Sequence, residues 1–107
     1  MRYGPAGIAA WALVIAAASG AAAADVAITQ KDRAFSPSDV TVSAGDTLVF
    51  VNADTVRHNV HSPTEGFVFD LDIQRPGQAD RLPVRKRGAF DVLCHIHPKM
   101  KLRVRVE

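Results

Sequence analysis

Short runs of alternating hydrophobic and polar residues, separated by turn residues, fill the chain from about residue 25 to its end. Val26 and Ile28 share one side of a first run, and Val40 and Val42 share one side of a second. Alternation with a period of two is typical of a β-strand with one buried face. Because no long helical period occurs in this region, the pattern predicts an all-β sandwich or barrel.

The middle of the chain adds further expected strands. The tight turn 44–46 leads into residues 47–51, whose unbroken apolar run predicts a strand buried on both faces. Three more runs follow, at 58–61, 67–71 and 81–84. Pro83 has no backbone N–H to give to a sheet, so we expect the last run to be an edge strand or a loop-like element.

The alternation is clearest at the C-terminal end. Residues 90–94 place Phe90, Val92 and Cys94 on one face, and residues 102–106 alternate apolar residues with arginines. Two such strands, joined by residues 95–100, can form a hairpin. We therefore expect that loop to carry whatever chemistry the domain has.

Apolar residues are concentrated in the first 24 positions, which raises the hydrophobic share of the 107 residues to 48%. Arg2, an apolar stretch from Ile8 to Ala18, and the run Ala22-Ala23-Ala24 before Asp25 follow the order of a secretory signal peptide. We expect cleavage before Asp25 and a periplasmic domain of residues 25–107. The alternative is an uncleaved membrane anchor, but the Ala-rich stretch falls short of the about 20 strongly apolar residues that a span needs. We therefore expect no membrane span in the mature chain.

The net charge and the cysteine content limit the classes of protein to which the chain can belong. The net charge of +2 is too balanced to make nucleic-acid binding the default, and a small monomeric domain is expected. Cys94 is the single cysteine, so an internal disulfide is excluded. A lone thiol is a liability in an oxidising compartment unless something occupies it.

Metal-binding side chains recur at intervals of three in the expected hairpin loop: Cys94, His97 and Met100. Thiolate, imidazole and thioether are the donors that select copper over hard cations, and a blue-copper site combines two His and one Cys with a distant axial Met. His58, at the start of an upstream strand, is the candidate for the second imidazole. Each residue alone is more often structural, and only their conjunction favours a metal site.

Two other hypotheses about metal binding remain open. A structural zinc site would use Cys94, His95, His97 and His58, but tetrahedral zinc has no use for Met100. Strand parity also sends His95 away from Cys94, and His61 away from His58. We expect His61 and His95 to be non-ligands, with a second surface metal site as the alternative.

The chain resembles the cupredoxins, small type 1 copper proteins, and most closely their amicyanin and plastocyanin branch. The segments that carry the resemblance are Phe35-Ser36-Pro37, Val40-Thr41-Val42, Gly45-Asp46-Thr47, Val51-Asn52, His58-Asn59-Val60-His61 and Cys94-x-x-His97-x-x-Met100. The last two together are highly specific. The resemblance implies a Greek-key β-sandwich that holds one copper per chain. It also implies that His58, Cys94 and His97 are the strong ligands and that Met100 is the axial ligand.

The function expected of such a site is one-electron transfer by a protein that is not an enzyme. Catalysis on a substrate would need an open coordination position with acid or base groups nearby, and the sequence indicates neither. The alternative is a periplasmic copper carrier or scavenger with a more open site. A Cu(II) carrier has no need of a thiolate, so Cys94 with Met100 favours electron transfer.

Further residues have expected roles around the metal. Pro98 has no N–H to give to the sulfur, so the backbone N–H of Asn59 is expected to be the main donor to the thiolate. Arg57, Lys99 and Lys101 are close in sequence to the expected ligands. If they gather at the copper end, they favour a redox protein partner with an acidic docking surface. The resemblance implies that electrons leave through His97 beside Pro98.

Overall fold

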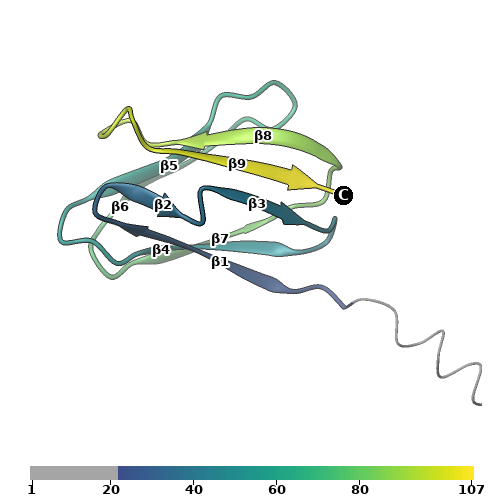
Figure 1. Cartoon of the computed structure of the whole chain (residues 1–107), viewed down its shortest axis with the longest axis horizontal. Coiled ribbons are helices and arrows are strands. Elements are labelled where there is room, and N and C mark those ends of the chain that lie inside the picture. Colours follow the sequence, from purple (N-terminus) through teal and green to yellow (C-terminus); the bar gives the residue numbers. More distant parts are fainter. Residues whose placement is uncertain (1–21) are drawn as a thin grey trace, which may run out of the picture.

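The computed structural model describes residues 22–107, which form two β-sheets packed face to face (Figure 1). The strands are β1 Asp25–Lys31, β2 Ala34–Ser36, β3 Asp39–Val42, β4 Thr47–Asn52, β5 His58–Ser62, β6 Phe69–Gln74, β7 Ala79–Pro83, β8 Gly88–Leu93 and β9 Lys101–Val106. Nearly all of the expected signal peptide, residues 1–24, lies outside the described residues, so its cleavage stays a prediction. Within residues 22–107 there is no helix with the length and apolar character of a membrane span.

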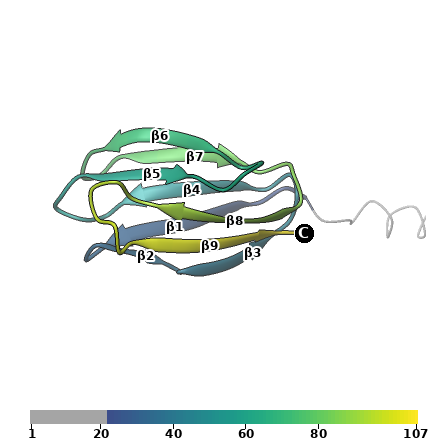
Figure 2. The ribbon, with the colours of Figure 1, turned by 90° about the horizontal axis from the view of Figure 1, so that it is seen from above.

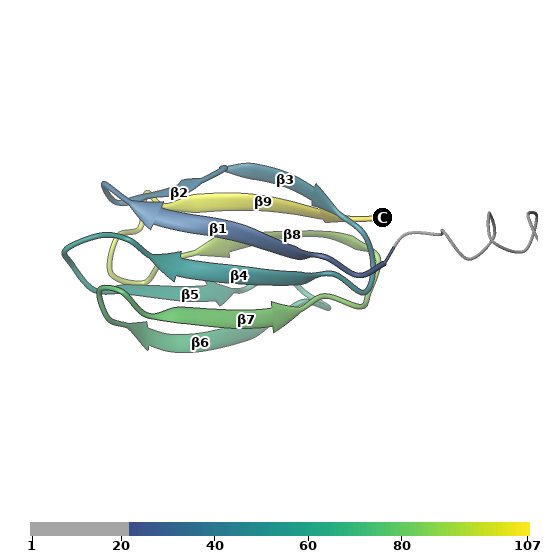
Figure 3. The same cartoon turned by 90° about the horizontal axis from the view of Figure 1, so that it is seen from below.

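The sheets have mixed strand directions. One has the order β2-β1-β4-β7 and the other the order β3-β9-β8-β5-β6. Most neighbours are antiparallel, whereas β1 with β4 and β3 with β9 are parallel. The views from above and below place β6 and β7 along one side of the sandwich and β2 and β3 along the other (Figures 2 and 3). The expected all-β sandwich is therefore confirmed.

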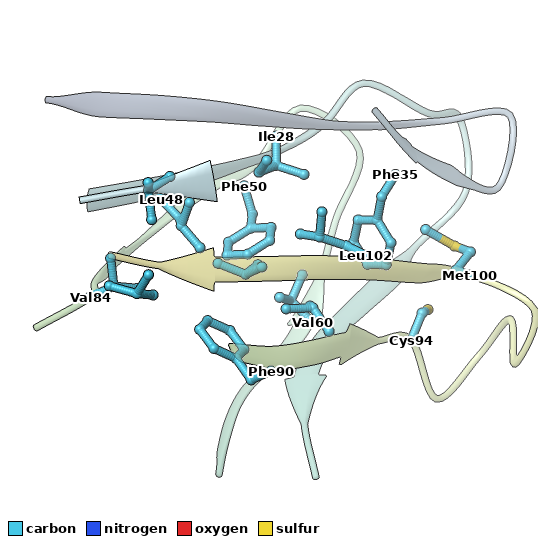
Figure 4. Close-up of a cluster of buried hydrophobic side chains, with 14 residues drawn as sticks. Ile28, Phe35, Leu48, Phe50, Val60, Val84, Phe90, Cys94, Met100 and Leu102 are labelled. Atoms are coloured by element: carbon cyan, nitrogen blue, oxygen red, sulfur yellow. The ribbon is translucent and has the colours of Figure 1, made fainter. Parts of the chain in front are cut away.

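The hydrophobic core fills the space between the sheets. Alternate residues of the central strands point into it, among them Ile28, Leu48, Phe50, Val60, Phe90 and Leu102. Val84 lies at one end of this cluster, and Cys94 and Met100 lie at the other (Figure 4). Burying apolar area at about 25 cal/mol per Å² is the main stabilising term for such a domain. The same core sets the positions of the two sulfur atoms.

The C-terminal hairpin has the register that the sequence predicts. β8 and β9 pair antiparallel from Gly88 with Val106 to Leu93 with Lys101. The buried faces carry Phe90 and Val92 on β8 and Leu102 on β9. The loop between them lies at the end of the sandwich opposite the C-terminus (Figure 1). β7, which ends at Pro83, is an edge strand, as expected from its proline.

Two strand expectations were wrong in detail. The strand at 47–51 was expected to be buried on both faces, but in β4 only Leu48, Phe50 and Asn52 are buried and the alternate residues are half-buried. The reason is that β4 lies within a sheet that packs on the core through one face, so the pattern is that of a sandwich strand. The strand expected at 67–71 is β6 at 69–74. Phe67 instead stacks on Phe90 before the strand begins, with the ring centroids 5.0 Å apart.

Candidate metal centre

Three polypeptide segments bring the donor side chains together. His58 is the first residue of β5, and Cys94 directly follows the last residue of β8. His97 and Met100 belong to the loop before β9. Since β8 lies between β5 and β9 in the second sheet, neighbouring strand ends deliver all of these residues to one end of the sandwich.

The donor atoms converge at metal-binding distances. Cys94 Sγ lies 3.9 Å from His58 Nδ1 and 3.8 Å from His97 Nδ1. All three donor atoms lie within 4.8 Å of one another. An ion with bonds of about 2.0 Å to nitrogen and 2.3 Å to sulfur, at a trigonal angle, separates those two donors by about 3.7 Å. The spacing therefore fits one ion that two imidazoles and a thiolate would hold.

Met100 completes a donor set that suits copper. Its side chain is buried at the same end of the core as Cys94 (Figure 4). A thioether is a soft, weak donor, and its presence beside a thiolate and two imidazoles distinguishes type 1 copper from zinc. The chemistry of the four side chains thus agrees with the spacing of the three strong donors.

A carboxylate that the sequence analysis did not identify orients His58. Asp54 Oδ2 lies 2.9 Å from His58 Nε2, and the imidazole is fully buried. Because an ionised carboxylate only accepts, Nε2 carries the proton and Nδ1 is left free to face Cys94. The available signal was the four-residue spacing of the two side chains at the end of a turn.

Asp54 is held ionised by its surroundings. Its carboxylate accepts the backbone N–H of Arg33 at 3.0 Å and that of Thr55 at 3.1 Å. The hydrogen bond from Arg33, followed by the one from His58, lowers the pKa of Asp54 to about 2. A charged acceptor behind a metal-binding imidazole strengthens it as a donor.

The Cys94 thiolate receives a hydrogen bond from a neighbouring strand. The Asn59 backbone N–H donates to Cys94 Sγ at 3.3 Å, which is the contact expected from the sequence. Pro98 follows His97 in the exposed part of the loop. A donor to sulfur reduces the electron density on the thiolate, so this bond affects the reduction potential.

His97 lies closer to solvent than His58. It is half-buried, whereas His58 is fully buried. Desolvation, followed by the nearby charges of His58 and Arg33, lowers the pKa of His97. Its imidazole is therefore neutral, and able to bind a metal, at neutral pH.

His61 and His95 point away from this site. Their rings stack on each other with centroids 3.5 Å apart and planes inclined by 4°. His95 Nε2 lies 3.5 Å from Asp70 Oδ2, and the His95 side chain is 62% exposed. The four-ligand zinc set that needs His95 beside Cys94 is therefore not assembled. In-plane lone pairs of parallel rings do not converge on one ion, which argues against a second metal site here.

The expected docking cations differ in their surroundings. Arg57 lines a hollow of about 410 Å³ with Ile96 and His97. Lys99 lines a second hollow of about 360 Å³. Arg33 also lines this hollow, although it was not among the cations expected from the sequence. Lys101 Nζ instead lies 3.8 Å from Asp91 Oδ2, so an acidic neighbour offsets its charge.

Comparison with known proteins agrees with this geometry. Residues 5–104 match the family model of the cupredoxin-like domain. An amicyanin from Paracoccus versutus is 33% identical over 97 residues, which cover 87% of this chain and 72% of that protein. The family match extends over the segments that supply His58, Cys94 and His97.

Solved structures give the same result. The structure of a reduced amicyanin variant has a TM-score of 0.73 at 26% identity and covers 85% of this chain and 89% of that chain. A copper-containing nitrite reductase from Thermus scotoductus also has a TM-score of 0.73 at 26% identity, but this chain spans only 22% of it. The chain therefore belongs to the cupredoxin-like family, and its cluster of His58, Cys94 and His97, with Met100 close to it, fits one type 1 copper.

Proposed function

We propose that this protein carries single electrons between redox partners in the periplasm, through one copper that alternates between Cu(I) and Cu(II). The observation that carries the proposal is the convergence of His58 Nδ1, Cys94 Sγ and His97 Nδ1 within 4.8 Å, with Met100 buried at the same end of the core. When bound, copper supplies a reversible one-electron couple. The proposed location depends on the signal peptide expected in residues 1–24.

The residues around the site support rapid electron transfer because they resist rearrangement. The hydrogen bond that His58 donates to Asp54 fixes the ring of His58, and the N–H of Asn59 fixes the sulfur of Cys94. Both ligands are buried in packed structure, so the donor positions change little when the charge of the site changes. A small reorganisation is the property that an electron carrier needs.

Export is supported by the order of features before Asp25, and it has a direct test. N-terminal sequencing or intact mass of the protein from the periplasmic fraction should give a chain that begins at Asp25. Retention of the full-length chain in the membrane fraction would favour the anchor alternative.

The proposed docking surface surrounds His97. We define it as the loop face, made of Arg33, Arg57, Ile96, His97, Pro98 and Lys99. Ile96 is 42% exposed and provides an apolar contact, while the three cations form a positive rim. A redox protein with an acidic surface fits this combination. Lys101 stays at the margin of the proposed surface because Asp91 offsets its charge.

The copper carrier or scavenger is the competing function, and retention of the metal separates the two. The copper-loaded protein is reduced with ascorbate, passed through a desalting column with a Cu(I) chelator, and reoxidised with ferricyanide. Electron transfer predicts that the visible band returns fully over repeated cycles. Loss of copper to the chelator in the first reduction would support the carrier instead.

A further inference from the structure

Asn59 connects the copper site to the outer face of the second sheet. Its backbone N–H donates to Cys94 Sγ, and its side-chain Nδ2 donates to Asp70 Oδ1 at 2.8 Å and to the Asp72 carbonyl at 3.1 Å. A bulge in the pairing of β5 with β6 brings both acceptors to Asn59, and Asp72 adopts a positive φ of 64° there. Bulges are a common way to redirect groups beside a functional site.

These contacts determine which way the Asn59 amide points. Both partners of Nδ2 only accept, so the NH₂ group must face them. The opposite atom, Oδ1, then faces the backbone N–H of His95 at 3.1 Å and His61 Nδ1 at 2.8 Å. Since Oδ1 only accepts, His61 must carry a proton on Nδ1 and donate it to Asn59.

The ring of His61 is fixed in that orientation from a second direction. It stacks on the ring of His95, which follows Cys94 in the chain. Stacking leaves His61 half-buried, and burial, followed by the charge of His95, lowers its pKa. At neutral pH it is therefore a neutral imidazole with one defined N–H.

We infer that His61, which is not a ligand, is a positioning residue for the copper thiolate: its Nδ1–H holds the side chain of Asn59, which aims the Asn59 backbone N–H at Cys94 Sγ. The inference rests on the proposed electron-carrying function of this site. Without the donor on His61, Asn59 loses one of two bonds to Oδ1, and its N–H bonds the sulfur less well. A thiolate with a weaker donor is more electron-rich and favours Cu(II), so the reduction potential falls.

A matched pair of variants separates the effect of the His61 N–H from the effect of the His61 ring. His61→Phe keeps an aromatic ring to stack on His95 but has no donor, whereas His61→Asn loses the ring and keeps an N–H of similar reach. The first readout is hydrogen exchange of the Asn59 backbone amide in the metal-free protein, measured by NMR. The second readout is the midpoint potential of the copper-loaded protein, with the position of its visible band.

The inference predicts that His61→Phe speeds exchange of the Asn59 amide by about tenfold, the loss of one ordinary hydrogen bond, and lowers the potential. His61→Asn should restore both values toward those of the unchanged protein. His95→Ala removes the stack but keeps the backbone donor, so it should leave the exchange rate within about twofold. Should His61→Phe not fold, His61→Ala makes the same comparison with His61→Asn.

Other results would overturn the inference. An unchanged exchange rate in His61→Phe would show that the Asn59 amide does not depend on the donor of His61. Faster exchange with an unchanged midpoint potential would show that the Cys94 thiolate does not depend on it. Equal effects of His61→Phe and His61→Asn would assign the role to the ring. A protein that holds no copper would refute the proposed function, whereas the exchange rates in the metal-free protein would still decide the role of His61.

Discussion

Single residues next to the ligands set the properties of this copper site. Asp54 is the strongest example, because its carboxylate accepts from His58 and from the backbone of Arg33. It thereby fixes which nitrogen of His58 faces the metal and places a negative charge behind it. A negative charge close to the site stabilises Cu(II) over Cu(I).

Asp54→Asn should therefore raise the midpoint potential, because the amide keeps an acceptor but removes the charge. Cyclic voltammetry of the copper-loaded protein measures the change. Asp32→Asn is the control, since Asp32 lies in the adjacent turn, is exposed and has a positive φ that Asn tolerates. Equal shifts in the two variants would show that only long-range charge matters and would contradict the role of the hydrogen bond.

The sequence predicted the ligands more readily than their supports. Cys94, His97 and Met100 are recognisable because they recur within one loop, and His58 because an imidazole begins a strand. The contact of Asp54 with Arg33 joins segments 21 residues apart, so no local pattern contains it. The bond from His61 to Asn59 could not be predicted either, because it depends on the bulge between β5 and β6.

At the scale of elements, two strands begin at turns that depend on single residues. These residues are Gly88 at the start of β8 and Asp46 before β4. Gly88 begins β8 with a φ of 143°, and a Cβ at this position would lie 2.8 Å from the ring of Phe67. Phe67 in turn stacks on Phe90 of the same strand. The start of β8 thus requires glycine for two reasons, the positive φ and the close approach of the Phe67 ring.

Gly88→Ala should lower the free energy of unfolding by about 1–3 kcal/mol through backbone strain and displacement of Phe67. Gly77→Ala is the matched control, because Gly77 also has a positive φ, of 85°, but a Cβ there meets nothing within 4 Å. Urea denaturation of the metal-free proteins gives both values. A loss in Gly77→Ala as large as that in Gly88→Ala would mean that contact with Phe67 contributes nothing.

Asp46 predicts a pH dependence of stability. Its carboxylate accepts the backbone N–H groups of Ser43 and Ala24, and these bonds, in that order, lower the pKa of Asp46. Cleavage before Asp25 would remove Ala24 and leave the hydrogen bond from Ser43, which is the larger cause. A lowered pKa in the folded state stabilises the protein above the ordinary range of an aspartate, and this contribution is lost as pH falls through the folded-state value.

Asp46→Asn should therefore destabilise the metal-free protein at pH 7 and have a smaller effect at an acid pH below the ordinary range of an aspartate, as the carboxyl of the unchanged protein becomes protonated. Denaturation curves of both proteins at the two pH values give the comparison. An effect of the same size at both would show that the charge of Asp46 is not what stabilises the turn.

Most strands were predictable, because the alternation of apolar and polar residues marks where each strand lies along the chain and which of its residues are buried. β4 and β6 were exceptions for physical reasons. An unbroken apolar run does not tell whether both faces of a strand are covered, and the Phe67 ring packs on the core before β6 begins.

On the scale of the whole molecule, the two ends of the sandwich differ. The copper ligands and the loop face lie at one end, and the C-terminus lies at the other (Figure 1). The net charge of the chain is only +2, so any electrostatic steering of a partner depends on how charges are clustered. Arg33, Arg57 and Lys99 provide such a cluster around His97.

Electron transfer to a small anionic oxidant should slow as ionic strength rises, whereas the rate with a cationic oxidant should not. Lys99→Glu and Arg33→Glu should reverse this order. Arg85→Glu is the control, because Arg85 lines a separate hollow beside Val84, at the far end of the core (Figure 4). Stopped-flow rates at several salt concentrations test this. Equal salt slopes for the two oxidants would show that the loop face does not steer a charged partner.

The central claim is that His58, Cys94, His97 and Met100 hold one copper through a thiolate bond. The most direct test is a titration of the metal-free protein with Cu(II), followed by visible absorption. We predict an intense sulfur-to-copper charge-transfer band that saturates at one equivalent, bleaches with ascorbate and is absent in Cys94→Ser. A colourless complex, or a band that survives in Cys94→Ser, would contradict it.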